Sequence, residues 1–386
     1  MKKISELWAL DEEIQNIAEQ IQAHEERRNS FASILRAKRH RMNLHNNLPL
    51  SQSYLVDDKL ARAVKSTELK GLRVGGIDGG LLKKTLRGIE LMITRACATI
   101  FEYTPSNRVS AIYYPEKTTL PAVKVELNPF SWREVDVNAS LERLKAELEL
   151  AIRVQDHHPV ELLLMDGSLR PHISDRPPSQ SVLSSKYERI KVLYEKLFEK
   201  TQETGTLLAG VVKDSRSQRF IRILGEILPH LINRYSDLKP LLSMDYRSIL
   251  RTAYDTDLFF RILDVGERSP ILRLNEFNVA EPMEKTQNSN NLVCIYLRTA
   301  RFDYPLRVEI LIGPHDPSRI VEKVSAMLLP MSSDNEGFAL PTVLIDADSQ
   351  ARLIEHDLDF LFSQLANRIG YPESLLKLRR ERMPFH

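Results

Sequence analysis

RVGGIDGGLL (residues 73–82) and LLLMDGSLRP (residues 162–171) are the two stretches that decide the fold of this 386-residue chain. Each is a short apolar run, typical of a buried strand, and each reaches an Asp-Gly pair at which we predict that the strand ends and the chain turns. Glycine permits a sharp turn and lets another group approach the backbone closely. Because functional groups gather at the carboxyl ends of parallel strands, we expect Asp78 and Asp166 to lie side by side.

The segments around these two stretches alternate between strand and helix patterns. After several strands comes a helix, then a strand, a helix and a strand, and this order predicts an α/β fold with a mixed sheet, parallel central strands and helical cover. A mostly helical insertion is expected at about residues 214–290, before two further strands. Strands are predicted at residues 73–78, 90–103, 110–114, 122–127, 161–166, 206–213, 291–298 and 306–312, and helices at residues 139–155, 185–204 and about 341–369.

The N-terminal segment differs from the rest of the chain. Residues 4–42 carry apolar side chains at helical spacing without Gly or Pro, so we predict a helical arm over residues 1–68 and a second domain over residues 69–386. The arm is suited to packing on its own domain, or to docking a partner or a second copy. Its basic cluster at residues 27–41, like a second one at 377–382, fits either a solvated surface or contacts to phosphates.

The bulk composition excludes several classes of protein. Hydrophobic residues make up 42% of the chain and the net charge is +2, as in ordinary globular proteins. Charged residues interrupt every stretch long enough to cross a bilayer, and the N-terminus lacks the apolar core of a signal peptide, so we expect no membrane span and a cytoplasmic location. Cys97 and Cys294 are too few for a disulfide scaffold and lie in apolar segments, which predicts buried core residues.

Two carboxylates held close together repel each other unless a cation lies between them. Oxygen ligands of this kind suit Mg²⁺ or Mn²⁺, and two such ions can assist the hydrolysis of a phosphodiester. Further carboxylates are available at Glu147 and Glu149, on the helix before the second strand, and at Asp346 and Asp348, near the C-terminal helix. The order Asp, Glu, Asp, Asp along the chain is that of ribonuclease-H-like nucleases. The alternative is that each Asp-Gly is only a turn and that Asp346 is only a helix cap.

Five motifs appear in an order that resembles the NurA nuclease family. They are GIDGG, LLLMDGSL, LLAGVVKDSRS, DLFFRILDVGERS and LRVEI, and the resemblance spans about residues 70–370. It implies a ribonuclease-H-like fold, a homodimer and manganese-dependent activity on DNA. It also implies a partnership with the hexameric HerA DNA translocase in processing DNA ends.

The resemblance also assigns roles to individual residues. Asp78 and Asp166 match the two catalytic aspartates, and Lys213 matches a lysine that could neutralise a phosphate. The family spacing favours Glu149 over Glu147 as the helical ligand. Near the C-terminus Asp346 and Asp348 both remain candidates, and Phe338 stands where the family has tyrosine. The expected metal ligands are Asp78, Glu149, Asp166 and Asp348, with Asp346 and Lys213 as further catalytic candidates.

We therefore expect a metal-dependent deoxyribonuclease, using Mn²⁺ or Mg²⁺, that cuts single- and double-stranded DNA as an exonuclease or endonuclease and works with a HerA-type ATPase. Two alternatives stay open. IDGGLLKKT loosely fits the phosphate hairpin of actin- and hexokinase-like ATPases, and the substitution at Phe338 leaves room for a catalytically degenerate adaptor of a translocase. Tyr296 and Phe302 fit either base stacking or the core of the sheet.

Overall fold

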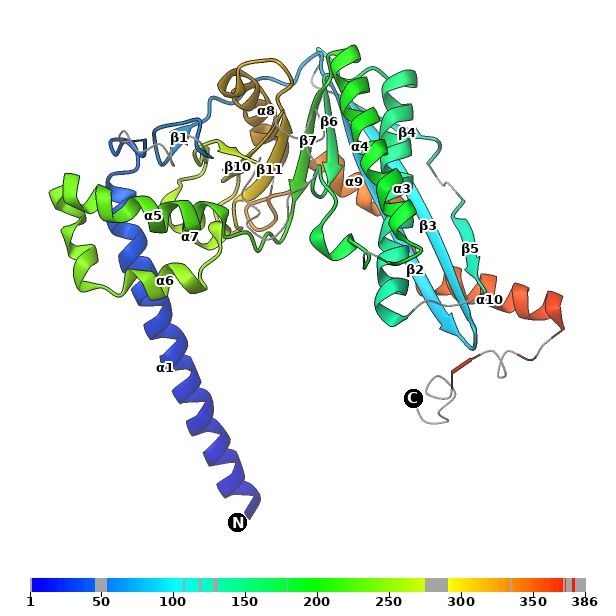
Figure 1. The fold of residues 1–386 in the computed structure, drawn as a ribbon, viewed down its shortest axis with the longest axis horizontal. Helices are drawn as coiled ribbons and strands as arrows, with labels where there is room; N and C mark the ends of the chain where they lie inside the picture. Colours follow the sequence, from blue (N-terminus) through cyan, green and yellow to red (C-terminus); the bar gives the residue numbers. More distant parts are fainter. Residues whose placement is uncertain are drawn as a thin grey trace.

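The computed structural model describes residues 2–378 except 46–53, 107, 118–119, 128–130, 179, 275–290, 334, 371 and 373–376. In the described part, a mixed sheet of 11 strands runs through the molecule with helices on both faces (Figure 1). The predicted α/β class with a mixed sheet is confirmed. The strand order is β1-β8-β10-β11-β7-β6-β2-β3-β4, with β5 paired to β3 and β9 paired to β10.

The centre of the sheet combines an antiparallel unit with parallel strands. Strand β2 (Arg73–Leu86) forms a long hairpin with β3 (Ile89–Tyr103), and β3 also pairs with β4 (Val109–Tyr114) and β5 (Ala122–Glu126). On its other side β2 pairs in parallel with β6 (Leu162–Asp166), which pairs in parallel with β7 (Leu207–Val212). The carboxyl ends of β6 and β7 and the middle of β2 therefore meet at one edge.

The outer part of the sheet is antiparallel. Strand β11 (Leu306–Leu311) pairs with β7 and with β10 (Leu292–Leu297). The short strands β8 (Glu267–Arg268) and β9 (Leu272–Arg273) pair with β10, and β1 (Arg62–Ala63) closes the sheet against β8.

Helices cover the two faces of the sheet. Helices α3 (Trp132–His157) and α4 (Ser184–Thr204) pack together on one face, with the 3-10 turn η1 (Ile173–Asp175) beside α3. Helices α8 (Pro317–Ser332) and α9 (Thr342–Ala351) pack on the other, where they bury an apolar cluster against the strands. Helix α10 (Glu355–Ile369) closes a smaller cluster over the far end of the β2–β3 hairpin.

The prediction of a single C-terminal helix over residues 341–369 is wrong. The chain breaks between α9 and α10, where Arg352 is extended (φ −57°, ψ 127°). The break lets the Leu353 side chain join the apolar cluster beneath α10. A continuous helix would carry residues 352–354 past the hairpin without this contact.

The N-terminal helix α1 (Lys2–Ala37) projects from the molecule at its N-terminal end and packs at its other end on the helical insertion (Figure 1). The described insertion comprises α5 (Arg219–Arg234), the 3-10 helix η2 (Ser236–Ser243), α6 (Tyr246–Thr252) and α7 (Asp255–Ile262). Phe31 and Leu35 of α1 are buried in the main core, whereas the Ile14 and Ile17 side chains are about half exposed.

Several members of the basic cluster at residues 27–41 contact acidic residues of the insertion. Arg39 Nε lies 3.0 Å from Glu267 Oε2, and both Arg36 and Arg39 donate to the Asp264 carboxylate. These side chains hold α1 to the insertion, so the cluster contributes to the tertiary structure. Of the second cluster, residues 379–382 lie outside the described residues.

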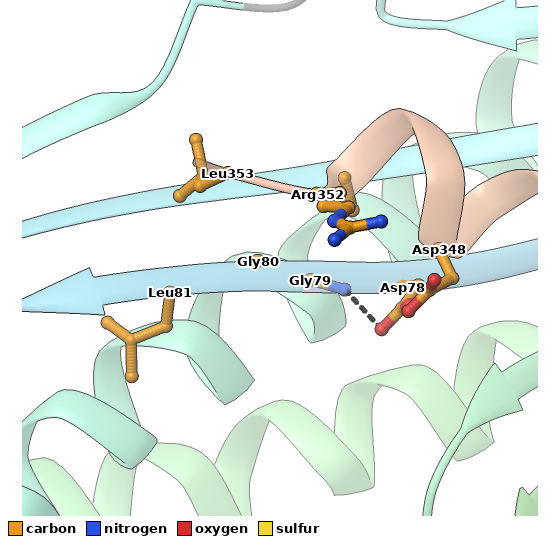
Figure 2. A pocket seen from close by; sticks show the side chains of 8 residues that line it. Asp78, Gly79, Gly80, Leu81, Asp348, Arg352 and Leu353 are labelled. Atoms are coloured by element: carbon orange, nitrogen blue, oxygen red, sulfur yellow. Dashed lines mark hydrogen bonds between the residues drawn. The ribbon is translucent and has the colours of Figure 1, made fainter. Parts of the chain in front are cut away.

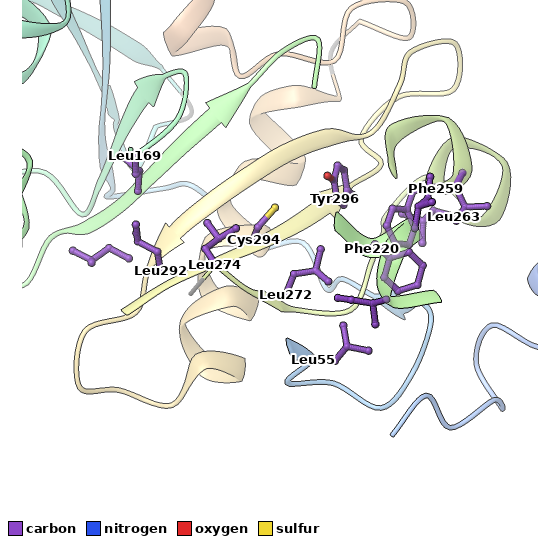
Figure 3. Packing of buried hydrophobic residues seen from close by; sticks show 14 of the residues in the cluster. Leu55, Leu169, Phe220, Phe259, Leu263, Leu272, Leu274, Leu292, Cys294 and Tyr296 are labelled. Atoms are coloured by element: carbon purple, nitrogen blue, oxygen red, sulfur yellow. The ribbon is translucent and has the colours of Figure 1, made fainter. Parts of the chain in front are cut away.

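The main core continues from the sheet into the insertion (Figure 3). The ring of Tyr296 on β10 stacks on Phe259 with centroids 5.1 Å apart, and Phe259 packs on Phe220 at 4.7 Å. Cys97 and Cys294 are both buried, as predicted. Within the described residues, no helix has the length and apolar character needed to cross a membrane.

Candidate metal centre

Strand β2 carries Asp78 in its middle. The prediction that this strand ends and turns at Asp78 is wrong, because β2 pairs with β3 without interruption as far as Leu86. The neighbouring glycines serve close packing instead. A β-carbon on Gly79 would lie 2.4 Å from Glu147 Oε1 on α3, and one on Gly80 would lie 2.1 Å from the Ala351 carbonyl oxygen of α9. Side chains alternate between the faces of a strand, so the two glycines admit one helix on each face of the sheet.

Asp166 is the last residue of β6, and here the predicted turn is confirmed. Gly167 adopts φ +118°, a conformation that L side chains rarely adopt. The buried Glu309 of β11 then holds the turn, accepting hydrogen bonds from Ser168 Oγ (2.7 Å) and from the Leu169 N–H (3.0 Å). Arg307 Nη2 lies 2.6 Å from Glu309 and offsets its buried charge.

Glu309 was not identified as a site residue from the sequence. Its signal is an acidic residue between Val308 and Ile310 in strand β11, which also carries Arg307. A carboxylate at such a position is buried only when charged or hydrogen-bonding groups surround it. The sequence does not show that one of those groups is the turn after Asp166, because the two segments lie 140 residues apart.

The structure brings three aspartates together. Asp78, Asp166 and Asp348 each offer a carboxylate oxygen, and these atoms all lie within 4.8 Å of one another. Asp78 comes from β2, Asp166 from β6 and Asp348 from α9, so long-range folding alone assembles the group. Lys213, just after β7, donates from Nζ to Asp166 Oδ2 at 2.7 Å. Asp78 is buried, while Asp348 is exposed and gives the group access to solvent.

Burial and neighbouring charges shift the pKa values of Asp78 and Lys213. Burial raises the pKa of Asp78 to about 8, and the charges of Asp166 and the contact with Asp348 add to the rise. The hydrogen bond from the Gly79 N–H (2.7 Å) and the nearby Lys213 act in the opposite direction. Burial disfavours a charged amine at Lys213, yet its pKa is raised because the bond to Asp166 and the other carboxylates outweigh that effect.

The glutamate on α3 that approaches the aspartates is Glu147. It is buried beneath Gly79, and this burial raises its pKa to about 8. The charge of Arg143 opposes the rise, and the charges of Asp78 and Asp166 add smaller contributions to it. Arg143 Nε lies 3.5 Å from Glu147 Oε1.

The structure does not bring Glu149 to the aspartates. Two residues along a helix rotate a side chain by about 200°, so Glu149 falls on the solvent stripe of α3 with Lys145, whose Nζ lies 3.7 Å away. Its side chain is 47% exposed. The choice of Glu149 over Glu147 therefore disagrees with the geometry, and Glu147 is the residue that the helix directs to the site.

Helix α9 presents its two aspartates differently. Asp348 lies beside Asp78 and lines a cavity of about 250 Å³ formed by residues 78–81 of β2 and by the end of α9 with Arg352 and Leu353 (Figure 2). Asp346 instead accepts a hydrogen bond from Thr99 Oγ1 at 3.0 Å, outside the group of three. The sequence did not decide between the two aspartates. In the structure Asp348 lies at the cavity, whereas Asp346 contacts β3.

The donor set fits a divalent cation. Lys213 and Arg143 supply two positive charges against the carboxylates of Glu147 and the three aspartates, so this cluster carries excess negative charge when ionised. Convergent carboxylate oxygens without sulfur or imidazole suit hard ions such as Mg²⁺ and Mn²⁺. The pKa values of Asp78 and Glu147 are raised mainly by burial, and the neighbouring carboxylates add to the rise.

Residues 72–378 match the NurA domain family. Similar solved structures include the NurA nuclease from Sulfolobus solfataricus, at 16% identity and TM-score 0.48 over 85% of this chain and 91% of that chain. A NurA structure with manganese matches at 11% identity and TM-score 0.43, over 92% and 97% of the two chains.

A more distant match is endonuclease V from Ciona intestinalis in complex with DNA containing an inosine, at 12% identity and TM-score 0.30 over 90% and 99% of the two chains. No curated protein matches the chain. The family match covers most of the sequence and includes all three converging aspartates. The chain therefore belongs to the NurA domain family.

Proposed function

We propose that this protein is a metal-dependent deoxyribonuclease whose centre is formed by Asp78, Asp166 and Asp348. The observation that carries the proposal is the convergence of three carboxylate oxygens within 4.8 Å at the sheet edge where β6 ends. Membership of the NurA family supports nuclease activity, and the ribonuclease-H-like assignment is supported by the antiparallel β2–β3–β4 unit followed by parallel β6 and β7.

The residues of the chain would act mainly by positioning the metal ion and the DNA backbone. Asp78, Asp166 and Asp348 would hold Mn²⁺ or Mg²⁺, with Glu147 completing the set from beneath Gly79. Such an ion, when bound, lowers the pKa of water and stabilises a departing oxygen. Lys213 lies beside Asp166 and would neutralise a phosphate of the DNA backbone. We assign Asp346 and Glu149 no ligand role, because one contacts Thr99 and the other faces solvent.

We also propose a partner, an oligomeric state and a domain organisation for this protein. We propose that the chain acts in the cytoplasm as a homodimer with a HerA-type hexameric ATPase in DNA-end processing, as the resemblance to NurA proteins implies. The N-terminal arm is proposed to span residues 1–68 and the nuclease domain residues 69–386. The start of the family match at residue 72 supports that boundary.

A cleavage assay tests the proposal. Wild type, Asp78→Ala and Asp166→Ala are incubated with labelled single- and double-stranded DNA and Mn²⁺, and circular dichroism checks the fold of each. We expect cleavage by the wild type and loss of cleavage in both folded variants. Equal cleavage by all three would reject the assignment of the centre. ATP hydrolysis without DNA cleavage would favour the ATPase alternative. The absence of both activities would favour the adaptor alternative.

A further inference from the structure

The turn between β10 and β11, residues 298–305, lies at the same sheet edge as the metal centre. Asp166 pairs with Val211, and Val212 pairs with Arg307, so the start of β11 is level with the end of β7. Strand β10 runs in the same direction as β7, because each is antiparallel to β11. With about 4.8 Å between neighbouring strands, the turn begins after β10, roughly 14 Å across the sheet from Asp166, and ends before β11, roughly 10 Å from it.

This turn exposes aromatic rings to solvent. Phe302 is 67% exposed and Tyr304 is 51% exposed, so neither belongs to the core of the sheet. Phe338, 47% exposed, belongs to the same surface because the Ala339 N–H donates to Asp303 Oδ2 at 2.7 Å and the Phe302 N–H donates to the Glu336 carbonyl at 2.8 Å. Exposed aromatic clusters of this kind commonly mark an interaction site.

The turn is held in place from below. Arg298 Nη1 donates to the Leu263 carbonyl at 2.7 Å and Nη2 to the Arg301 carbonyl at 3.0 Å. The Tyr304 ring packs on Phe260 with centroids 5.0 Å apart. The backbone of the turn and the Tyr304 ring are therefore held in place, so that little ordering is needed there when a ligand stacks on the ring.

Basic side chains lie at the metal centre, on the loop after β7 and on this surface. Lys213 contacts Asp166, and the loop that follows carries the exposed Arg216 along the same edge, with Asp214 as its acidic residue. Arg301 lies over the Phe302 ring at 5.1 Å. A row of cations beside exposed rings is the arrangement with which proteins bind single-stranded nucleic acid, where the cations follow the backbone and the rings stack on unpaired bases.

We propose that Phe302, Tyr304 and Phe338 form a stacking surface for the bases of single-stranded DNA whose backbone passes Arg216 and Lys213 to the metal centre. This inference rests on the proposed nuclease function. It assigns the surface to single strands, because the bases of a duplex stack on one another and do not present free faces to an exposed ring. Tyr296, by contrast, is buried and belongs to the core.

Binding without cleavage tests the inference. Fluorescence anisotropy measures the affinity of the full chain for a labelled 20-nucleotide oligothymidine in EDTA, at low salt. The double variant Phe302→Ala/Tyr304→Ala is expected to bind at least about tenfold more weakly, since each stacked base contributes about 1–3 kcal/mol. Phe302→Tyr should keep the affinity. Phe360→Ala is the matched control, because Phe360 is similarly exposed (57%) but lies on α10.

A duplex of the same length provides the second arm of the experiment. Its affinity should change less than twofold in the double variant. The inference is overturned if the double variant binds the single strand as tightly as the wild type, if Phe360→Ala weakens binding equally, or if duplex binding falls to the same extent. Because no metal is present, these results do not depend on the nuclease assay. A wild type that binds single strands as expected but cuts no DNA would refute only the proposed function.

Discussion

At the scale of single residues, the site depends on which carboxylates face one another. The sequence identified Asp78 and Asp166 correctly as neighbours because each follows an apolar strand run. The family spacing favoured Glu149 over Glu147, whereas the rotation of the helix directs Glu147 to the site. The decisive fact is the missing side chain at Gly79, which leaves the space that Glu147 occupies.

Substituting Glu147 and Glu149 one at a time tests which of them supports the metal site. Glu147→Gln removes a buried carboxylate beside Asp78 and should lower Mn²⁺-dependent cleavage by about 10- to 100-fold, the usual effect of losing a group that supports a metal site. Glu149→Gln removes an exposed charge and should leave the cleavage rate near that of the wild type. Initial rates on single-stranded DNA measure both. The reverse ranking would show that the helix directs Glu149 to the site.

The raised pKa values predict how the stability of the metal-free protein changes with pH. Burial raises the pKa of Asp78 and Glu147 to about 8, whereas their ordinary values are 3.8 and 4.5. Below pH 4 both groups are protonated in the folded and unfolded chains. Between about pH 4 and pH 8 the unfolded chain releases protons that the folded chain keeps, so this contribution to stability is lost as the pH rises.

Denaturant midpoints at pH 5.5 and pH 8 in EDTA measure this effect. Between pH 5.5 and pH 8 the denaturant midpoint of the Asp78→Asn variant should fall less than that of the wild type. The variant should also be the more stable protein at pH 8. Mn²⁺ should stabilise the wild type more at pH 8 than at pH 5.5, because the cation competes with protons for the carboxylates. A fall of the same size in Asp78→Asn would mean that other groups cause it.

At the scale of secondary-structure elements, the sequence predicted most strands closely but misplaced two ends. Strand β2 continues past Asp78, because β3 offers a partner over its whole length. The predicted last helix is divided after Ala351, where Leu353 packs against apolar residues of the hairpin. Both errors have the same origin. Local patterns carry no information on what lies across the sheet, and here long-range pairing and packing decide where an element ends.

The contact between β2 and α9 can be tested through Gly80. A methyl group there would lie 2.1 Å from the Ala351 carbonyl, so Gly80→Ala should move α9, displace Asp348 and cost about 1–3 kcal/mol in the free energy of unfolding. Gly225→Ala is the control. That glycine lies within α5 with its nearest atom at 3.8 Å, and alanine is the better helix former, so stability should be equal or slightly higher. Equal urea midpoints for the two variants would contradict the close packing.

At the scale of the whole molecule, the N-terminal arm and the insertion pack as one unit. The sequence predicted each as helical, but their contact could not be predicted, because it joins residues more than 200 positions apart. Phe31→Ala should destabilise the protein by about 3 kcal/mol through loss of a buried ring, whereas the half-exposed Ile17→Ala should change stability by less than about 0.5 kcal/mol. Thermal unfolding measures both, and similar values would place Phe31 outside the core.

We propose that three segments distant in the sequence converge to bind one catalytic cation. Electron paramagnetic resonance of free Mn²⁺ during a titration at pH 8 tests it most directly, with wild type, Asp348→Asn and Asp346→Asn as the three samples. The structure predicts that Asp348→Asn weakens Mn²⁺ binding by tenfold or more and that Asp346→Asn binds like the wild type. Unchanged binding in Asp348→Asn, or no Mn²⁺ binding by the wild type, would contradict the account.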